Sequence, residues 1–322
     1  MKNQEKIFVI GHKNPDTDSI CSAIAYCDIK NRTTQESRYI PKRAGQINEE
    51  TEYVLNRFGV HPPGYLSNIG TQVKDMDIRL SPEANKSMSL KNAWDLMQEN
   101  SIVSLPIREK DGTLEGLITI GDIAKTYMDT TDSYLLSRAR TQYQRIAETI
   151  GGKVIEGNAH GYFIQGKIMV ATANPDKMKE YVEENDMVIM GNREEDHLQA
   201  IEQNVSCIIV GMGIEVTEKV LKLAHEKDIV IISSPYDTFT ISRLINQSIP
   251  VKYIMKTDNL VTFNTEDFTD DIQEVMIKHR HRAFPVINKK GKCIGTISRR
   301  NFLDMHRKKV VLVDHNEKDQ AV

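Results

Sequence analysis

The segment Ile7–Ser19, which reads IFVIGHKNPDTDS, decides the fold of the N-terminal part of the chain. Its four apolar residues predict a strand, the polar stretch predicts a loop, and a helical pattern follows. Ligands bind at the carboxyl ends of strands in α/β sheets, so this loop is a candidate active site. It holds His12, Asp16 and Asp18, a set that suits a hard to borderline cation such as Mn²⁺. The alternative is a loop without metal, in which Asp18 or Ser19 caps the helix.

The composition is that of an ordinary globular protein with two or three domains. The chain has 322 residues, of which 39% are hydrophobic and 27% charged, and its net charge is −3. We expect no nucleic-acid partner, because there is no basic excess. We expect no membrane partner, because no apolar run reaches the roughly 18 residues of a membrane-spanning helix. The four cysteines form no CxxC pair and the N-terminus lacks signal-peptide features, which predicts reduced thiols and a cytoplasmic location.

Two copies of a unit of about 55 residues recur along the chain, with a constant offset of 179 positions. The offset relates Met76 to Met255, Pro106 to Pro285, Gly116 to Gly295 and Asp122 to Asn301. Each copy predicts a helix (90–99 or 271–278), an apolar strand, a glycine turn, a second strand and a closing helix. Trp94 lies in the first of these helices and is interpreted as a core or interface residue, with adenine stacking as the alternative.

The repeat resembles the CBS domain over residues 73–129 and 252–307. The closing signature Gly-x-x-(Ser/Thr)-x-x-(Asp/Asn) occurs at 116–122 and at 295–301. CBS domains work in pairs and commonly bind adenine nucleotides in the cleft between them, so AMP, ADP and ATP are the expected regulatory ligands. The hydroxyl would hold a phosphate and the carboxylate or amide would accept the ribose hydroxyls. The candidate nucleotide-binding residues are Thr119, Asp122, Ser298, Arg299, Arg300 and Asn301.

The second copy is more basic than the first, with Lys278–Arg282 and the pair Arg299–Arg300. We therefore expect it to supply more of the phosphate contacts. The alternatives are that these charges are solvated at a helix end, and that the CBS pair is purely structural. CBS pairs usually assemble into dimers, so the resemblance also implies a homodimer.

The region between the two copies predicts a small α/β domain. Apolar runs of strand length alternate with helical patterns over residues 167–170, 187–190, 197–203, 207–210, 217–226 and 229–232. The stretch SPYDTFT at 234–240 resembles the motif of the DRTGG domain, which is inserted between CBS copies in one enzyme group. It reads Asp-Thr-Phe where the motif has Asp-Arg-Thr. Gly211–Gly213 is interpreted as a turn.

Residues 11–26, GHKNPDTDSICSAIAY, closely resemble the N-terminal motif of the family II inorganic pyrophosphatases, which are DHH phosphoesterases. Residues 43–51 continue the likeness, and 310–317, VVLVDHNE, return to it. The resemblance implies an α/β fold in which a discontinuous parallel-sheet DHH domain is interrupted by a CBS pair with an inserted DRTGG domain. The expected boundaries are 1–70 and 308–322 for the DHH domain, 71–130 and 251–307 for the CBS copies, and 131–250 for the DRTGG-like domain.

The same resemblance implies a two-metal site. His12, Asp16 and Asp314 would bind one ion, Asp18 and Asp314 the other, and Asp314 would bridge ions about 3.5–4 Å apart. His315 would orient ligands or substrate without binding metal directly. The implied reaction is hydrolysis of pyrophosphate to two phosphates with Mn²⁺ or Co²⁺, supported by Mg²⁺.

The chain also departs from the family pattern. After the segment around Asp314 the family continues with a paired-His motif, a further metal-binding Asp and a second domain with a Ser-Arg-Lys-Lys-type segment. The sequence ends at Val322 without them. We therefore expect the chain as written to be an incomplete and poorly active form. The alternatives are a non-catalytic adenine-nucleotide sensor with a DHH remnant, and DHH chemistry on a polyphosphate or a nucleotide phosphodiester.

Overall fold

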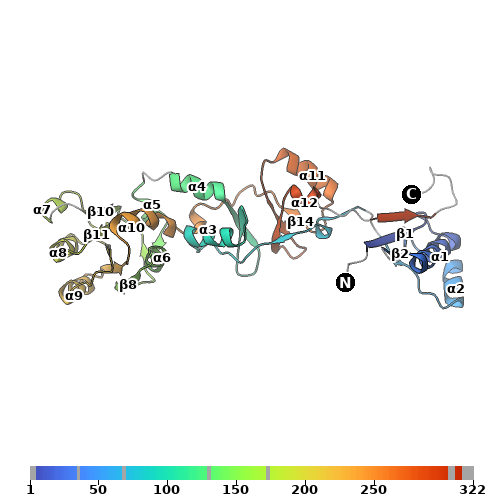
Figure 1. Cartoon of the computed structure of the whole chain (residues 1–322), viewed down its shortest axis with the longest axis horizontal. Helices are drawn as coiled ribbons and strands as arrows, with labels where there is room; N and C mark the ends of the chain where they lie inside the picture. The colour runs from blue at the N-terminus through green and yellow to red at the C-terminus, as the bar shows by residue number, and fades with distance from the viewer. Residues whose placement is uncertain are drawn as a thin grey trace. The chain divides into compact units, whose positions relative to one another are not determined.

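The computed structural model describes residues 5–34, 37–66, 70–128, 132–171, 175–303 and 309–313 (Figure 1). Contacts between Cα atoms divide the chain into two compact units. The first unit comprises residues 1–78, 264–280 and 298–322, and the second comprises 79–263 and 281–297. This division runs through the second CBS copy. None of the described helices is long and apolar enough to cross a membrane.

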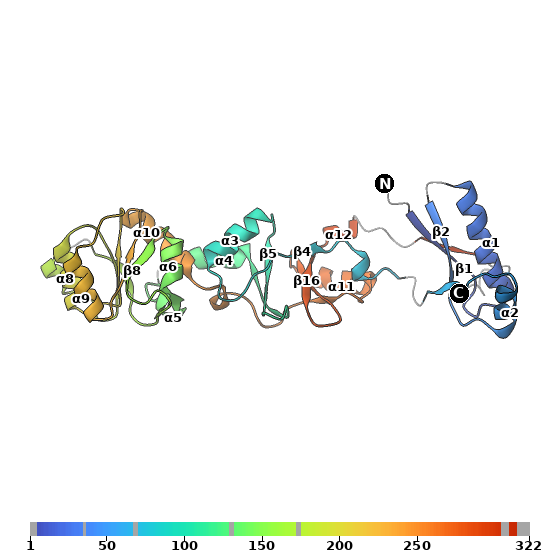
Figure 2. The same ribbon diagram turned by 90° about the horizontal axis from the view of Figure 1, so that it is seen from below.

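The first unit contains a parallel sheet with the strand order β17-β1-β2-β3. Its strands are β1 (Glu5–Ile10), β2 (Ser37–Arg43), β3 (Gly64–Tyr65) and β17 (Lys309–Leu312). The helix α1 (Thr17–Thr33) runs beside this sheet (Figure 2) and buries Ala23 and Cys27 with Val9, and α2 (Glu49–Arg57) follows β2. Because β17 pairs with β1 from Ile7↔Lys309 to Ile10↔Leu312, the predicted discontinuous parallel sheet is confirmed.

The first unit also holds helical parts of the CBS region. These are η1 (Val73–Asp75), α11 (Thr269–Lys278) and α12 (Arg300–Leu303). The backbone links the two copies directly, because the N–H of Val73 donates to the Asp267 carbonyl and the N–H of Thr269 donates to the Thr71 carbonyl, both at 2.9 Å. Segments that lie almost 200 residues apart in the chain are therefore neighbours.

The second unit contains the predicted small α/β domain, whose sheet has the order β10-β11-β12-β13-β8. The strands are β8 (Lys153–Glu156), β10 (Ile168–Val170), β11 (Met187–Met190), β12 (Cys207–Val210) and β13 (Val230–Ser233). Only β8 is antiparallel to its neighbour in this sheet. Ile189 and Ile209 belong to one apolar cluster, and Val188 and Ile208 belong to another. The strands are thus buried on both faces, which explains their continuous apolar sequences.

Helices and short strands complete this domain. They are α5 (Leu135–Arg138), β7 (Thr141–Gln142), α6 (Tyr143–Thr149), β9 (Tyr162–Phe163), α7 (Pro175–Met178), α8 (Glu194–Glu202), α9 (Glu218–Glu226), α10 (Thr238–Leu244), η2 (Ile245–Ser248) and η3 (Val251–Tyr253). Asp237 is the N-cap of α10, and its carboxylate accepts the Thr240 N–H at 2.9 Å and the Thr240 hydroxyl at 2.8 Å. These bonds lower the pKa of Asp237. Asp237 and Thr240 of the SPYDTFT stretch thus form a helix cap.

The two CBS copies share their architecture in detail. The first copy has α3 (Leu90–Glu99), β5 (Ser104–Arg108), β6 (Leu114–Thr119) and α4 (Ile120–Met128). In the second copy β15 (Phe284–Ile287) and β16 (Cys293–Ile297) lie in a sheet with β14 (Phe263–Asn264) and β4 (Arg79–Leu80). Both hairpins carry a register shift, at Ile107/Arg108 and at Val286/Ile287, which again lie 179 positions apart. The predicted repeat is therefore confirmed down to its irregularities.

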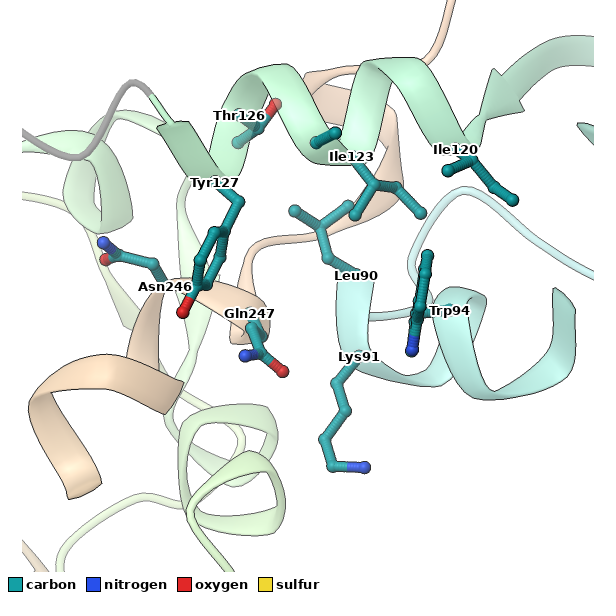
Figure 3. Close-up of a pocket in the computed structure, with 10 residues that line it drawn as sticks. Leu90, Lys91, Trp94, Ile120, Ile123, Thr126, Tyr127, Asn246 and Gln247 are labelled. Atoms are coloured by element: carbon teal, nitrogen blue, oxygen red, sulfur yellow. The ribbon is translucent and has the colours of Figure 1, made fainter. Parts of the chain in front are cut away.

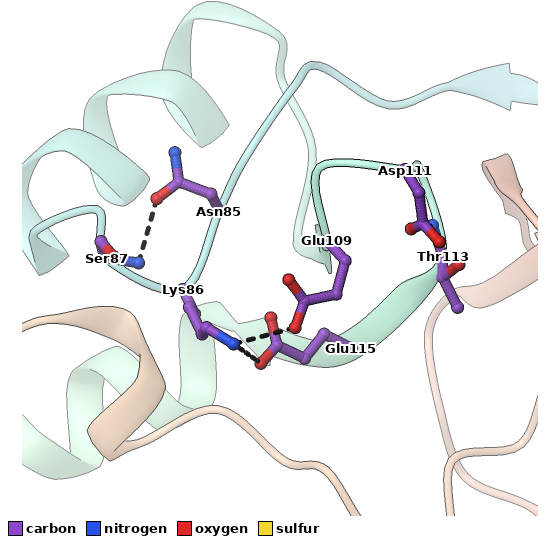
Figure 4. A network of polar contacts seen from close by, with 7 residues as sticks. All are labelled: Asn85, Lys86, Ser87, Glu109, Asp111, Thr113 and Glu115. Atoms are coloured by element: carbon purple, nitrogen blue, oxygen red, sulfur yellow. Dashed lines mark hydrogen bonds and ion pairs between the residues drawn. The ribbon is translucent and has the colours of Figure 1, made fainter.

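A network of charged side chains connects two segments of the first CBS copy (Figure 4). The Lys86 ammonium donates to Glu109 Oε1 at 2.8 Å and to Glu115 Oε1 at 2.6 Å, and so joins the loop before α3 to the β5–β6 hairpin. Hydrogen bonds to Glu109 and Glu115 raise the pKa of Lys86, and the hydrogen bond to Lys86 lowers the pKa of Glu109. Glu115 Oε2 is buried and has no hydrogen-bond partner in the described part of the chain.

Replacement Lys86→Met is expected to lower the melting temperature near pH 7 by no more than a few degrees, because two neighbouring carboxylates lose a shared cation that is itself partly exposed. The lowered pKa of Glu109 means that its stabilising contribution is present above pH 4.5, its unperturbed value, and is lost as the pH falls through the folded-state value. The difference between variant and unmodified chain should therefore shrink towards pH 3. Thermal unfolding measured across pH checks this, and a pH-independent difference would contradict it.

Candidate functional site

The predicted metal loop lies at the carboxyl end of β1, as expected for an α/β sheet. β1 ends at Ile10 and α1 begins at Thr17. Asp16 is the N-cap of α1, and its Oδ1 accepts the N–H of Ser19 at 2.8 Å. The carboxylate is thereby fixed at the positive end of a 17-residue helix. The capping role that we considered as an alternative to metal binding is present, but it falls to Asp16.

His12 and Asp16 approach each other across this loop. His12 Nε2 lies 3.4 Å from Asp16 Oδ1, and the side chain of Asp16 is 51% exposed. An ion about 2.1 Å from each ligand can join atoms up to roughly 4.2 Å apart, so this pair can hold one divalent cation. The Ser19 hydroxyl beside the loop is buried and has no partner among the described residues. The donor set therefore fits a cation of the manganese or cobalt type.

Two glycines shape the loop by close packing. A Cβ atom on Gly11 would lie 1.8 Å from Ser19 Oγ, so only glycine permits this approach of β1 to α1. A Cβ on Gly45 would lie 2.4 Å from the carbonyl oxygen of Lys13 and 2.6 Å from Pro15 Cδ. The segment after β2 thus packs directly against the metal loop and fixes its path.

Of the other expected metal ligands, the structure describes only Asp18. Asp18 lies in the first turn of α1, where its Oδ1 accepts the Ser22 hydroxyl at 3.3 Å. In the described ranges, no group of three or more His, Cys, Asp or Glu side chains could hold a metal. Asp314 and His315 lie outside the described residues. The register Ile10↔Leu312 nevertheless shows that β17 ends at the same edge of the sheet as β1.

The first CBS signature forms a compact polar group at the junction of β6 and α4, which we call the first half-site: Thr119, Asp122 and Lys256. Asp122 Oδ2 accepts the Thr119 N–H at 2.9 Å and the Thr119 hydroxyl at 2.6 Å. Asp122 Oδ1 faces the Lys256 ammonium at 3.5 Å. The hydroxyl and carboxylate expected to bind a nucleotide are therefore adjacent.

The equivalent group in the second copy, which we call the second half-site, comprises Ser298, Asn301 and Asp77. Asn301 Oδ1 accepts the Ser298 N–H at 2.7 Å and the Ser298 hydroxyl at 2.8 Å. Its Nδ2 donates to the Asp77 carbonyl at 2.6 Å. The two signatures thus adopt the same local geometry, one with a carboxylate and one with an amide.

The first arginine of the second signature, Arg299, has backbone partners in this structure. The Arg299 guanidinium donates to the carbonyl oxygen of Met276 through Nε at 3.2 Å, and to that of His279 through Nη2 at 2.7 Å. It therefore holds the last carbonyls of α11, where a cation is favourable. These bonds use Nε and Nη2 of the guanidinium, and none of them uses Nη1. Arg300 is the first residue of α12.

Sequence reasoning missed two residues of these half-sites, Lys256 and Asp77. They are related by the offset of 179, and each follows the methionine, Met255 or Met76, from which the repeat is recognised. That position was therefore a detectable signal. The expected site residues came from the closing signature alone, and only the folded chain shows that the start of one copy meets the end of another.

An apolar pocket of about 350 Å³ lies between α3, α4 and η2 (Figure 3). Leu90, Ile123, Trp94 and Tyr127 line it, and the Trp94 and Tyr127 side chains are 40% and 41% exposed. Figure 3 shows both aromatic side chains at the rim, on either side of Leu90 and Ile123. Trp94 is therefore a surface residue rather than a core residue, and the interface interpretation stays open.

Comparison with protein-family models assigns most of the second unit. The CBS domain matches residues 77–129 and 251–308, and the DRTGG domain matches residues 145–248. Among solved structures, the CBS and DRTGG domains of the regulatory region of Clostridium perfringens pyrophosphatase, complexed with the activator diadenosine tetraphosphate, match with a TM-score of 0.68 and 34% identity. The match covers 71% of this chain and 100% of that chain.

Two curated relatives match along the whole chain, and a third matches a part of it. The cobalt-dependent inorganic pyrophosphatase of Clostridium perfringens is 38% identical over 320 residues, which are 99% of this chain. A probable manganese-dependent inorganic pyrophosphatase of Thermotoga maritima is 30% identical over 321 residues. The chain spans 58% of the length of each. The manganese-dependent inorganic pyrophosphatase of Bacillus subtilis is 46% identical over 69 residues, 21% of this chain and 22% of that protein.

Proposed function

Because this chain belongs to the family II inorganic pyrophosphatases that carry a CBS–DRTGG regulatory region, we propose that the protein hydrolyses pyrophosphate to two phosphates under the control of adenine nucleotides. The observation that carries the catalytic part is the His12–Asp16 pair at the end of β1. Relatives named as manganese- or cobalt-dependent pyrophosphatases support the metal.

In this proposal His12 and Asp16 would hold one Mn²⁺ or Co²⁺ ion, Asp18 would contribute to a second, and Asp314 would be shared between them. Such ions would supply an activated water and neutralise the phosphate charges, with Mg²⁺ as a supporting ion. The chain's own residues position the ligands: Gly11 and Gly45 fix the loop, and α1 orients Asp16. His315 would orient ligands or substrate from beyond Asp314.

Phosphate release from pyrophosphate in the presence of Mn²⁺ or Co²⁺ tests the catalytic proposal. For the whole protein we expect metal-dependent release that AMP or ADP changes. Nucleotide binding without any phosphate release, with either metal, would instead support a non-catalytic nucleotide sensor.

The regulatory part of the proposal places adenine nucleotides at the two half-sites. Thr119 and Ser298 would contact phosphate through their hydroxyls, Asp122 and Asn301 would accept ribose hydroxyls, and Arg299 and Arg300 would add positive charge. The shared geometry of the half-sites supports this, as does the complex of the related Clostridium perfringens regulatory region with diadenosine tetraphosphate.

Replacement Asp122→Ala is expected to weaken AMP binding by about 10–100-fold, because charged hydrogen-bond partners contribute roughly 1.5–3 kcal/mol each. The change also removes the bonds by which Asp122, in the first turn of α4, holds Thr119 at the start of that helix, so Asp237→Ala, which removes the N-cap of α10, is the control for loss of an Asp–Thr pair at a helix start. Calorimetric titration with AMP should show normal affinity for the control. Equal losses in both variants would mean that the effect is one of stability alone.

We also propose that the protein is a cytoplasmic homodimer that forms through its CBS domains. The free state of all four cysteines supports the cytoplasm. The apolar side chains of Trp94, Tyr127 and Met128 on α3 and α4 are exposed in the single chain. Their exposure supports a dimer in which a second copy covers them. Sedimentation of the chain over a range of concentrations tests the dimer, and a monomer at all concentrations would overturn it.

A further inference from the structure

The two half-sites differ in the charge of one side chain. The residue that carries it lies outside the closing CBS signature. Lys256 in the first half-site is replaced in the second by Asp77, its equivalent at the offset of 179. A cation beside Asp122 therefore corresponds to a carboxyl-bearing residue beside Asn301. The cation of Lys256 thus belongs to the first half-site, whereas the sequence pattern led us to expect more of the phosphate contacts from the second copy.

The backbone fixes the position of Lys256 independently of its side chain. Its N–H donates to the Leu117 carbonyl and its carbonyl accepts the Leu117 N–H, both at 2.9 Å. Gly116 permits this approach, because a Cβ there would lie 2.9 Å from the Lys256 carbonyl oxygen and 2.8 Å from Met255 Sδ. The Cα of Lys256 is thus anchored next to β6, just before the Thr119 hydroxyl.

The side chain, by contrast, is exposed and forms an ion pair with Asp122. The Lys256 side chain is 59% exposed, and its ammonium lies 3.5 Å from Asp122 Oδ1. An exposed ion pair at this distance contributes little to stability, so a ligand can replace it at small cost. Asp122 Oδ2 already accepts two donors from Thr119, which leaves Oδ1 as the acceptor that exchanges partners.

We propose that Lys256 binds the phosphate of a nucleoside phosphate in the first half-site and thereby selects phosphorylated ligands over the nucleoside. The inference rests on the proposed nucleotide regulation and assigns it a specificity residue. In the empty site the ammonium pairs with Asp122. When a nucleotide binds, ribose hydroxyls replace the ammonium at Oδ1, and the ammonium turns to the phosphate, for which a flexible lysine is well suited.

Calorimetric titration of the full chain with adenosine, AMP and ADP tests this assignment in the unmodified chain and in Lys256→Gln. We expect the variant to bind AMP and ADP about tenfold more weakly, since one charge-assisted contact is lost. Its affinity for adenosine should be unchanged or higher, because no ammonium competes for Asp122. Lys256→Arg should restore phosphate selectivity, and Lys110→Gln, an exposed change in the β5–β6 turn, is the matched control.

The outcomes separate this inference from the function on which it rests. Failure of the unmodified chain to bind any of the three ligands would overturn the proposed nucleotide regulation itself. Binding of AMP with the same affinity by the unmodified chain and Lys256→Gln would overturn only the role of Lys256. Equal losses for adenosine and AMP would also overturn it, because they would show a general disturbance of the half-site instead of phosphate recognition.

Discussion

Gly166→Ala is expected to cost at least about 3 kcal/mol of stability and to unfold the DRTGG domain well below the melting temperature of the unmodified chain. Gly166 precedes β10 and has φ +94°, a conformation that L residues rarely adopt. A Cβ atom there would lie 2.1 Å from the carbonyl oxygen of Asn185. The alanine therefore meets both an unfavourable dihedral angle and a steric clash with backbone.

The neighbouring backbone cannot yield easily to relieve this clash. The Asn185 carbonyl accepts the Ser206 hydroxyl at 2.6 Å. Asp186, the next residue, is 1% exposed, and its carboxylate accepts the N–H groups of Lys167 and Glu183 at 2.9 Å each. Movement of Asn185 would therefore break hydrogen bonds that hold the start of β11.

Gly213→Ala separates the two costs and is the matched control. Gly213 has φ +64°, but a Cβ there would meet no atom within 4 Å. Its alanine variant should lose only the roughly 1–2 kcal/mol of the left-handed conformation. Urea unfolding of both variants measures the difference, and equal destabilisation would show that the clash at Gly166 is relieved by local rearrangement.

The sequence predicted those elements whose stability comes from burial along their whole length. The runs 187–190 and 207–210 are observed as β11 and β12 with the expected bounds, because both faces of each strand are buried. The helix expected at 197–203 begins earlier, at Glu194. The first turn is acidic and has no apolar residue, so a search for apolar periodicity assigns it to the preceding loop. Acidic side chains nevertheless stabilise the amino end of a helix.

Contacts between distant segments were beyond prediction from local pattern. The two-residue strands β4 and β14 carry no periodicity and exist only because a sheet edge is available. The carboxylate of Asp122 was expected from the signature, but its neighbour Lys256 follows from the pairing of Leu117 with residues that begin the other copy. Likewise Arg299 reads as a free cation in the sequence, and the fold directs it to the end of α11.

Asp16→Asn is expected to lower the affinity of the chain for Mn²⁺ or Co²⁺ by at least about 10–100-fold while leaving α1 intact. Asparagine caps helices as well as aspartate does, so the bond from the Ser19 N–H can persist. The amide lacks the negative charge that a divalent ion requires beside His12 Nε2. Asp28→Asn, at an exposed carboxylate of the same helix that pairs with Arg32, is the matched control.

Asp16→Ala decides between the two roles of this residue, because a cap and a metal ligand respond differently to the two replacements. If Asp16 only caps α1, asparagine is harmless and alanine costs about 1 kcal/mol of stability. If Asp16 binds metal, both variants lose the ion, and alanine alone also lowers the melting temperature. Calorimetric titration with Co²⁺, combined with thermal unfolding in the absence of metal, measures both effects. One oxygen, Asp16 Oδ1, both accepts the Ser19 N–H and faces His12, so the structure alone is compatible with either role. Unchanged Co²⁺ affinity in Asp16→Asn would show that Asp16 acts as a helix cap and not as a metal ligand.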